Sequence, residues 1–120
     1  MRPYQHTMNK PQAIRSLESL AGAQFIPNIT PELKAVASQF AVAITPAMSQ
    51  LIDCEDAEDP IAAQFVPSIK ELAVHPEELA DPISDYTFSP VEGIVHRHTD
   101  RVLLKLTSIC AVYCRFCFRR

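Results

Sequence analysis

Three cysteines lie close together near the end of the 120-residue sequence, in the segment SICAVYCRFCFRR. Cys110, Cys114 and Cys117 form the pattern C-x-x-x-C-x-x-C. Three thiolates on one short loop can ligate three irons of a cubane iron-sulfur cluster, whereas the ordinary ferredoxin arrangement supplies four cysteines. The fourth iron then lacks a protein ligand, so a molecule that carries both an amine and a carboxylate can chelate it. The spacing therefore predicts a reducible cluster in direct contact with a small, cleavable molecule.

Two other interpretations of these cysteines stay open on the sequence. A zinc site can combine the three cysteines with a histidine such as His96 or His98, although zinc motifs usually bring their ligands in two separated pairs. The cysteines can also be structural and bind no metal. A fourth cysteine, Cys54, lies far away in the run CEDAED, where acidic neighbours disfavour a reactive thiolate. We expect Cys54 to be a free, partly buried thiol.

Positive charge gathers around the three cysteines, although the whole sequence carries a formal charge of -3. Residues 1–96 contain 5 Lys and Arg against 13 Asp and Glu, whereas residues 97–120 contain 6 against 1. A local basic cluster of this kind fits a site for small anions. The acidic remainder argues against a general nucleic-acid-binding surface.

The composition is that of one globular domain, with 48% hydrophobic and 21% charged residues. No apolar run approaches the roughly 20 residues that cross a bilayer, so we do not expect a membrane protein. The start, MRPYQHTMNK, lacks the apolar stretch of a secretory signal. We therefore expect a cytoplasmic protein, in whose reducing compartment metal binding or catalysis by cysteines is favoured over a disulfide.

Short helices joined by stiff extended segments are indicated by ten prolines against two glycines. The first helix is predicted from a set of apolar residues at helical spacing, which Gly22 is placed to end: Ile14, Leu17, Leu20 and Ala21. Three later helix starts share a capping side chain followed by proline at the first helical position: Thr30-Pro31, Thr45-Pro46 and Asp59-Pro60.

The inner faces of two of these helices can be assigned from their apolar positions. The helix after Thr30 carries one apolar stripe, made of Leu33, Val36, Ala37 and Phe40, and the next presents Met48, Leu51 and Ile52. Pro67 ends the helix that starts at Asp59-Pro60. The segment HPEELADPIS, residues 75–84, predicts one more helical turn that stops before Pro82.

The run RVLLKLTS, residues 101–108, differs from everything before it, because it is mostly apolar and has the length of one buried strand. No other segment is a convincing partner strand, and the backbone groups of a strand need partners. We therefore expect the chain to be the front part of a longer protein, cut as a parallel α/β architecture begins. The cysteine loop then follows the carboxyl end of the strand, where (β/α) barrels place their chemistry.

Four consecutive regions are expected along the chain. They are a loose N-terminus at 1–10, a helical N-terminal region at 11–80, an extended arm at 81–100, and a strand with the cysteine loop at 101–120.

The segment HRHTDRVLLKLTSICAVYCRFCFRR resembles the one that opens the barrel of the lysine 2,3-aminomutase family, within the radical S-adenosylmethionine enzymes. The strong likeness covers the last quarter of the chain, and the preceding pieces DPISD and SPVEGIVHR add to it. Family members typically have HRYPDRVL where this chain has HRHTDRVL, so His98 and Thr99 depart from the pattern. The departure affects local packing and not the cysteines. The fold that the resemblance implies is a mainly α N-terminal region leading into the first strand of a truncated (β/α) radical S-adenosylmethionine barrel.

The resemblance implies roles for five residues of this chain. Cys110, Cys114 and Cys117 would ligate a four-iron, four-sulfur (4Fe-4S) cluster, whose open iron S-adenosylmethionine (SAM) chelates. Reductive cleavage of that cofactor gives a 5'-deoxyadenosyl radical, which acts on a substrate held by pyridoxal 5'-phosphate (PLP). Phe116 would pack near the adenine, and Arg119 would pair with the substrate carboxylate. On the residues alone, a core phenylalanine and a solvated arginine are alternatives. We assign no individual function to the other arginines of the segment.

The implied reaction interconverts L-lysine and β-lysine by 2,3-amino migration, and the full-length enzyme is expected to be a homo-oligomer. Relatives that act on lysine for the modification of elongation factor P, or on glutamate, are alternatives. The family's PLP lysine lies beyond Arg120, and Lys105 precedes the cysteine loop and does not replace it. We therefore expect no catalytic residue and no aminomutase activity in these 120 residues. From another class, a helical interaction module that binds zinc is the alternative.

Overall fold

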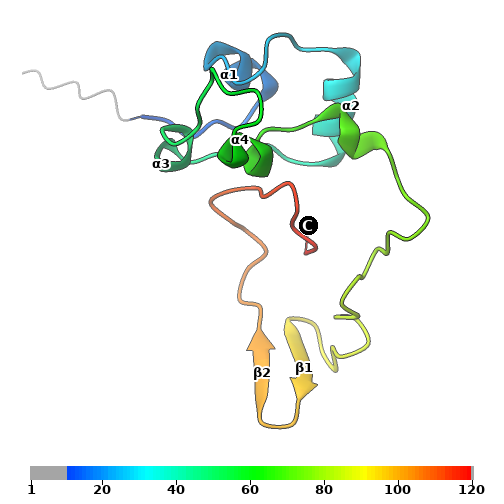
Figure 1. Cartoon of the computed structure of the whole chain (residues 1–120). Helices are drawn as coiled ribbons and strands as arrows, with labels where there is room; N and C mark the ends of the chain where they lie inside the picture. The colour runs from blue at the N-terminus through cyan, green and yellow to red at the C-terminus, as the bar shows by residue number, and fades with distance from the viewer. Residues whose placement is uncertain (1–10, 120) are drawn as a thin grey trace, which may run out of the picture.

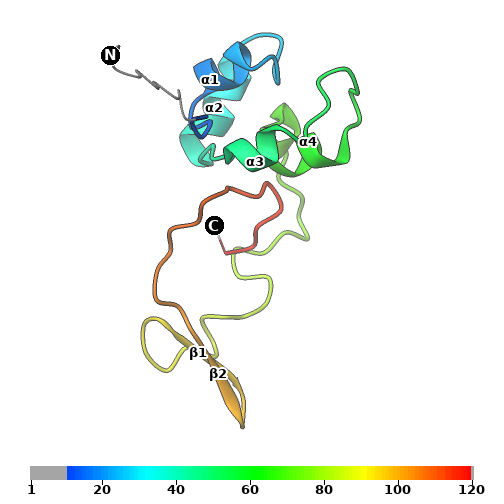
Figure 2. The same cartoon turned by 90° about the vertical axis from the view of Figure 1, so that its left-hand side faces the viewer.

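The computed structural model describes residues 11–119, and the predicted loose N-terminus at 1–10 lies outside the described residues. Short helices form one end of the molecule, a two-stranded hairpin forms the other, and the C-terminal segment runs back from the hairpin to the helices (Figure 1). Figure 2 shows the same separation in a view turned by 90°. The Cα radius of gyration is 18.7 Å, whereas a compact chain of this length has about 13 Å. The chain is therefore more extended than a compact domain of its length.

The first two helices begin at capping side chains. Helix α1, Leu17–Gly22, has Ser16 as its N-cap, and helix α2, Pro31–Gln39, has Thr30, whose side chain accepts a hydrogen bond from Leu33 N. The end of α1 at Gly22 and the start of α2 confirm the sequence predictions. Ile14 was predicted within the first helix, but it forms an isolated antiparallel bridge with Ile44.

The remaining helices are single turns or little more. Helices α3, Pro46–Ser49, and α4, Pro60–Phe65, start as predicted after Thr45 and Asp59. A 3-10 helix, η1 at Ile69–Leu72, was not predicted. The predicted helical turn at 75–84 is wrong, because this segment contains only non-helical turns. Pro82 disfavours helical backbone at Asp81, whose carboxylate instead accepts hydrogen bonds from Asp85 N and Tyr86 N.

A small apolar core holds the helical end together. Leu20, Val36 and Ile44 are fully buried. Around them lie further buried residues from several elements: Ile14, Leu17, Ile26, Leu33, Val42 and Phe65. The predicted inner face of α3 is correct for Met48 and Ile52, which pack against this core, and wrong for Leu51, which is 58% exposed.

The predicted buried strand is the second strand of a hairpin. Strand β1, Ile94–His98, pairs antiparallel with β2, Arg101–Leu104, through a two-residue turn at 99–100. The prediction was wrong in its length and burial, since β2 ends at Leu104 and all of its residues are exposed. It was also wrong that no partner strand exists, because part of the predicted extended arm is β1. A two-residue turn brings neighbouring strands together locally, so the pairing needs no distant segment.

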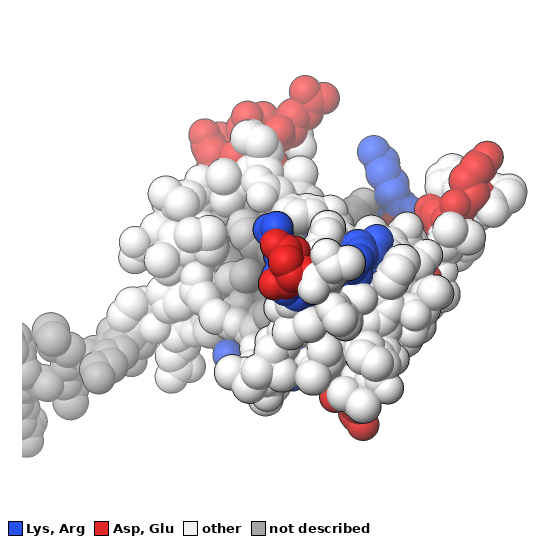
Figure 3. All heavy atoms as spheres, turned by 90° about the horizontal axis from the view of Figure 1, so that it is seen from below, with Lys and Arg blue, Asp and Glu red and all other residues white. Residues whose placement is uncertain are grey.

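The hairpin end has an apolar surface. Its exposed large hydrophobic side chains are Val102, Leu103, Leu104, Leu106 and Ile109. The face seen from below is mainly uncharged, with a few separate charged groups (Figure 3). Residues 11–119 form no closed barrel, and the hairpin is their only sheet. Among the same residues, no helix has the length and apolar character needed to cross a membrane.

Candidate functional site

The cysteine loop is an irregular segment that follows β2, passes beside the helices and turns back from them at its C-terminal end (Figures 1 and 2). Two backbone hydrogen bonds attach it to the helical end. Tyr113 N donates to Ala43 O at 2.8 Å, and Arg115 N donates to Gln64 O at 2.8 Å. The helical region therefore holds the middle of the loop, on both sides of Cys114.

Arg115 strengthens this attachment through a buried ion pair. Its Nε and Nη2 donate to the two carboxylate oxygens of Glu71 at 3.0 and 2.6 Å, and its Nη1 donates to Ala41 O at 2.6 Å. The side chains of Arg115 and Glu71 are only 5% and 13% exposed. The guanidinium also lies 5.1 Å from the ring centre of Tyr113. No individual function was assigned to Arg115 from the sequence, where Glu71 lies 44 residues away.

The three cysteines differ in their surroundings. Cys110 is exposed, whereas Cys114 and Cys117 are half-buried and are joined by a hydrogen bond from Cys117 N to Cys114 O at 3.1 Å. Cys110 and Cys117 line one hollow of about 430 Å³. Cys114 instead packs against the apolar core of the helical end. Within the described chain, these sulfurs are not gathered into a group that could hold a metal.

The donor chemistry nevertheless fits an iron-sulfur cluster with an open position. Three free thiols lie on one irregular loop, and two of them share a hollow. Ligation by all three requires the loop around Cys114 to rearrange. The alternative zinc site with His96 or His98 is not assembled either, since residues 11–119 contain no group of three or more candidate ligands around one point.

Cys54 is exposed, so the prediction of a partly buried thiol is wrong. Its Sγ lies 3.9 Å from Ala23 O. The surrounding acidic run folds into turns in which Asp side chains accept from backbone N–H groups, as Asp53 does from Glu55 N at 2.9 Å. Such turns satisfy the backbone at the surface and leave the thiol outside the core.

Phe116 is 67% exposed, which contradicts its alternative interpretation as a core phenylalanine. It lines a second hollow, of about 350 Å³, together with Phe40, Phe118 and Cys117. An exposed aromatic ring beside a cysteine can stack on a planar ligand.

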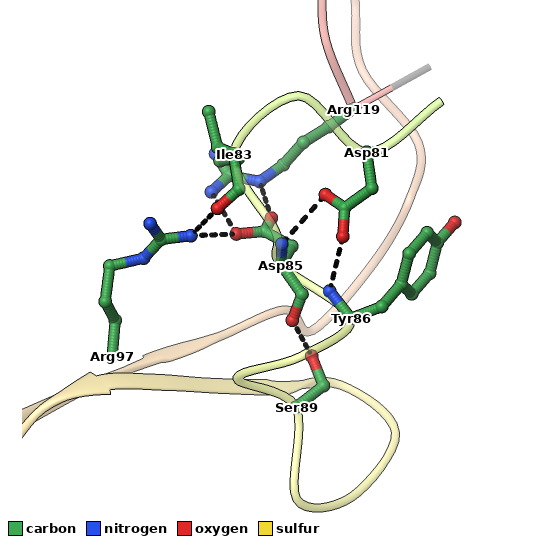
Figure 4. A network of polar contacts seen from close by, with 7 residues as sticks. All are labelled: Asp81, Ile83, Asp85, Tyr86, Ser89, Arg97 and Arg119. Carbon is green, nitrogen blue, oxygen red and sulfur yellow. Dashed lines mark hydrogen bonds and ion pairs between the residues drawn. The ribbon is translucent and has the colours of Figure 1, made fainter. Parts of the chain in front are cut away.

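Arg119 is held by a carboxylate and is not simply solvated. Its Nε donates to Asp85 Oδ2 at 2.7 Å, and its Nη2 lies 3.4 Å from Asp85 Oδ1. Arg97 Nη2 lies 3.4 Å from the same Oδ1 and also donates to Ile83 O (Figure 4). The hydrogen bond from Arg119, aided by the charges of Arg119, Arg97 and Lys105, holds the pKa of Asp85 below its ordinary value.

Asp81 fixes the turn that carries Asp85. Its carboxylate accepts from Asp85 N and Tyr86 N, both at 2.8 Å, while Ser89 Oγ donates to Asp85 O at 2.7 Å (Figure 4). Neither aspartate was predicted to be a site residue. The available signal was the DPISD segment, in which an aspartate before proline is typical of a turn.

The sequence of the chain is similar to those of several known proteins. The chain is 41% identical to the L-lysine 2,3-aminomutase of Clostridium subterminale over 110 residues, and 39% identical to that of Methanococcus maripaludis over 113 residues. These matches cover 89% and 93% of this chain and 26% of each relative. The glutamate 2,3-aminomutase of Clostridioides difficile is 41% identical over 88 residues, which cover 73% of this chain and 21% of that protein.

The chain thus spans about a quarter of the length of the curated relatives that it matches. No protein-family profile matches it.

Proposed function

Because the chain belongs to the lysine 2,3-aminomutase family, we propose that it forms the cofactor-binding part of an amino-acid 2,3-aminomutase that acts on lysine. One observation carries this proposal. Cys110, Cys114 and Cys117 lie on a loop that Tyr113 and Arg115 attach to the helical region. Cys110 and Cys117 line a hollow that Arg119 also lines. A site that joins metal ligands to a carboxylate-binding side chain suits an amino acid as substrate.

In the proposed site, Cys110, Cys114 and Cys117 hold a 4Fe-4S cluster with one open iron. When bound, the cluster and S-adenosylmethionine supply the radical that removes hydrogen from the substrate. The neighbouring protein groups stabilise the negative charge of thiolates and cofactor. Arg119 and Lys105 line the same hollow as two of the cysteines and give it cationic groups.

Phe116 is proposed to pack against the adenine of the cofactor. Its side chain is exposed next to Cys117, and the hollow that it lines has two further aromatic walls. Aromatic rings of this kind can cover one face of a purine.

Arg119 is proposed to bind the substrate carboxylate. A guanidinium presents a planar pair of donors that matches a carboxylate, and a partly exposed position leaves it accessible. Its side chain is 40% exposed.

Pyridoxal phosphate is proposed to be bound by other residues of the enzyme, because the chain covers only about a quarter of its relatives. We infer that these 120 residues alone do not convert lysine to β-lysine. Formation of β-lysine by the purified chain with all cofactors would contradict this inactivity.

We also propose that β2 is the first strand of a barrel. The enzyme is proposed to act in the cytoplasm as a homo-oligomer.

Glutamate is the second candidate substrate, because a glutamate 2,3-aminomutase matches 73% of the chain at a comparable identity. A relative that modifies lysine for elongation factor P is a further variant of the same chemistry. The side chain of lysine is positive and that of glutamate negative, so the sign of the groups around the distal end of the substrate decides between them.

Iron binding by the cysteines tests the proposal. The chain is reconstituted anaerobically with iron and sulfide, and its iron and acid-labile sulfide are measured. We expect about four of each per chain, and loss of both in Cys114→Ser. Cys54→Ser is the matched control, because this exposed cysteine lies outside the loop, and it should keep the full content. Equal loss in both variants, or no uptake of iron and sulfide by the unchanged chain, would refute the assignment.

A further inference from the structure

Asp85 joins three segments of the chain that are far apart in the sequence. Its carboxylate faces Arg97 from β1 and Arg119 from beyond the cysteines, while its own backbone is fixed by Asp81 and Ser89 (Figure 4). Its side chain is 11% exposed, against 37% and 40% for the two arginines. The carboxylate is therefore the enclosed and fixed member of this network.

The contact with Asp85 occupies only one edge of the Arg119 guanidinium. Nε and Nη2 face the carboxylate, and among residues 11–119 no hydrogen-bond partner is found for Nη1. A guanidinium has five N–H donors in a rigid plane, so fixing one edge also fixes the direction of the other. The terminal edge, with Nη1, stays able to donate to a second carboxylate.

The charged groups around Asp85 can balance the negative charge of that second carboxylate. The charges of Arg97, Arg119 and Lys105 lower the pKa of Asp85, and the carboxylate of Asp81 accepts a hydrogen bond from Asp85 N. These five side chains carry three positive and two negative formal charges. Asp85, Arg119 and Lys105 line the same hollow of about 430 Å³ as Cys110 and Cys117. An anion in this hollow would complete the charge balance.

We propose that Asp85 is the positioning residue for Arg119, and that it orients the terminal edge of the guanidinium for the carboxylate of an amino-acid substrate. The inference rests on the proposed function, because it takes Arg119 as the carboxylate-binding group. Asp85 touches neither substrate nor cofactor in this role. Its effect is to remove rotational freedom from Arg119 before the substrate arrives, so that less entropy is lost on binding.

The orientation can be measured on the 120-residue chain by the hydrogen exchange of arginine Nε–H groups in nitrogen-15 NMR spectra. Arg101 supplies the internal reference, because its Nε also donates to an aspartate, Asp100, at 3.0 Å, but in a pair that is 72% and 63% exposed. We expect Arg119 to exchange at least about tenfold more slowly than Arg101, since exposed ion pairs hold their partners weakly. Exchange at the same rate would overturn the proposal.

Three variants separate positioning from general stability. Asp85→Asn should bring the Arg119 exchange rate to that of Arg101, Asp85→Glu should restore part of the difference, and Asp100→Asn is the matched control that should leave Arg119 unchanged. The dispersion of the backbone amide signals shows whether each variant is folded. If Asp85→Asn does not fold, the comparison in the wild-type chain and in Asp85→Glu still decides.

Carboxylate binding is tested with L-lysine and with 1,5-diaminopentane, which lacks only the carboxylate. L-lysine should shift the Arg119 signal, the diamine should not, and Asp85→Asn should weaken the lysine response about fivefold or more. No shift with lysine, an equal shift with the diamine, or unchanged lysine binding in Asp85→Asn would each overturn the proposal. None of these measurements needs the cluster, so failure of the cysteines to bind iron would refute the proposed function separately.

Discussion

Replacing Glu71 with glutamine tests whether the buried ion pair attaches the cysteine loop to the helical region. Glutamine keeps the shape of the side chain, and its carbonyl oxygen can still accept the hydrogen bond from Ser68 N, which is 2.9 Å long in the native chain. The lost feature is the negative charge opposite Arg115. Both side chains are largely buried, so the charge of Arg115 would be left without its carboxylate.

Breaking a buried pair by removing one partner costs about 3–5 kcal/mol. Since every 1.4 kcal/mol is tenfold, the opening equilibrium of the loop should shift by roughly two orders of magnitude or more. The assay is backbone hydrogen exchange at Tyr113 and Arg115, whose N–H groups bond to the helical region, with Ile44 N–H as a reference within the core bridge. We expect faster exchange at the two loop amides and little change at Ile44.

Two further variants control this experiment. Glu77→Gln makes the same chemical change at an exposed glutamate and should leave all three amides unchanged. Replacing both partners, Glu71→Met with Arg115→Met, should recover much of the protection, because a buried apolar pair leaves no charge unpaired. If Glu71→Gln altered exchange at Tyr113 and Arg115 by less than about threefold, the ion pair would not hold the loop.

Three other predictions concern the core, a cap and one carboxylate. Leu20→Ala should lower the free energy of unfolding by about 2–5 kcal/mol in urea denaturation, because Leu20 is fully buried; a loss below about 1 kcal/mol would contradict the assigned core. Thr30→Ala should cost about 1 kcal/mol by leaving Leu33 N without its cap, whereas Thr30→Ser should keep most of the stability; an equal loss in both would argue against the cap.

The pKa of Asp85 is lowered from its ordinary value of 3.8, chiefly by the hydrogen bond from Arg119, so its stabilising contribution is present above that value and is lost as the pH falls through the lowered pKa. A carboxyl carbon-13 titration should therefore show Asp85 ionised throughout the range above about pH 4, and a midpoint above the ordinary value would contradict the pairing.

The sequence predicted those features that depend on neighbouring residues. Thr30, Thr45 and Asp59 each cap a helix whose first residue is proline, and the structure places a helix at every one of these starts. A cap acts within three residues, so its signal is fully local. Gly22 ends α1 for the same reason.

The errors arose where distant or competing contacts decide the structure. Ile14 has helical spacing, but its backbone pairs with Ile44, 30 positions along the chain. The apolar run at 101–108 suggested a buried strand, but a local turn pairs its first part with β1 and leaves it exposed. Hydrophobicity alone does not distinguish a covered strand from one whose face is uncovered.

The cysteines and Arg119 could be proposed as site residues from the sequence, whereas the residues that support them could not. The spacing of the cysteines in sequence indicated the cluster chemistry, and the family resemblance implied a role for Arg119. Glu71 and Asp85 could not be found in this way, because they reach Arg115 and Arg119 across 44 and 34 residues. Pairing between charged residues so far apart is fixed only by the folded backbone.

We propose that Cys110, Cys114 and Cys117 hold a cluster with one open iron for S-adenosylmethionine. The most direct measurement is the paramagnetic resonance spectrum of the anaerobically reconstituted and reduced chain, recorded without and with S-adenosylmethionine. We expect the signal of a reduced 4Fe-4S cluster that changes shape when the cofactor is added, and loss of that signal in Cys117→Ser. A cluster signal that is identical with and without the cofactor, or a colourless chain that contains zinc, would contradict the claim.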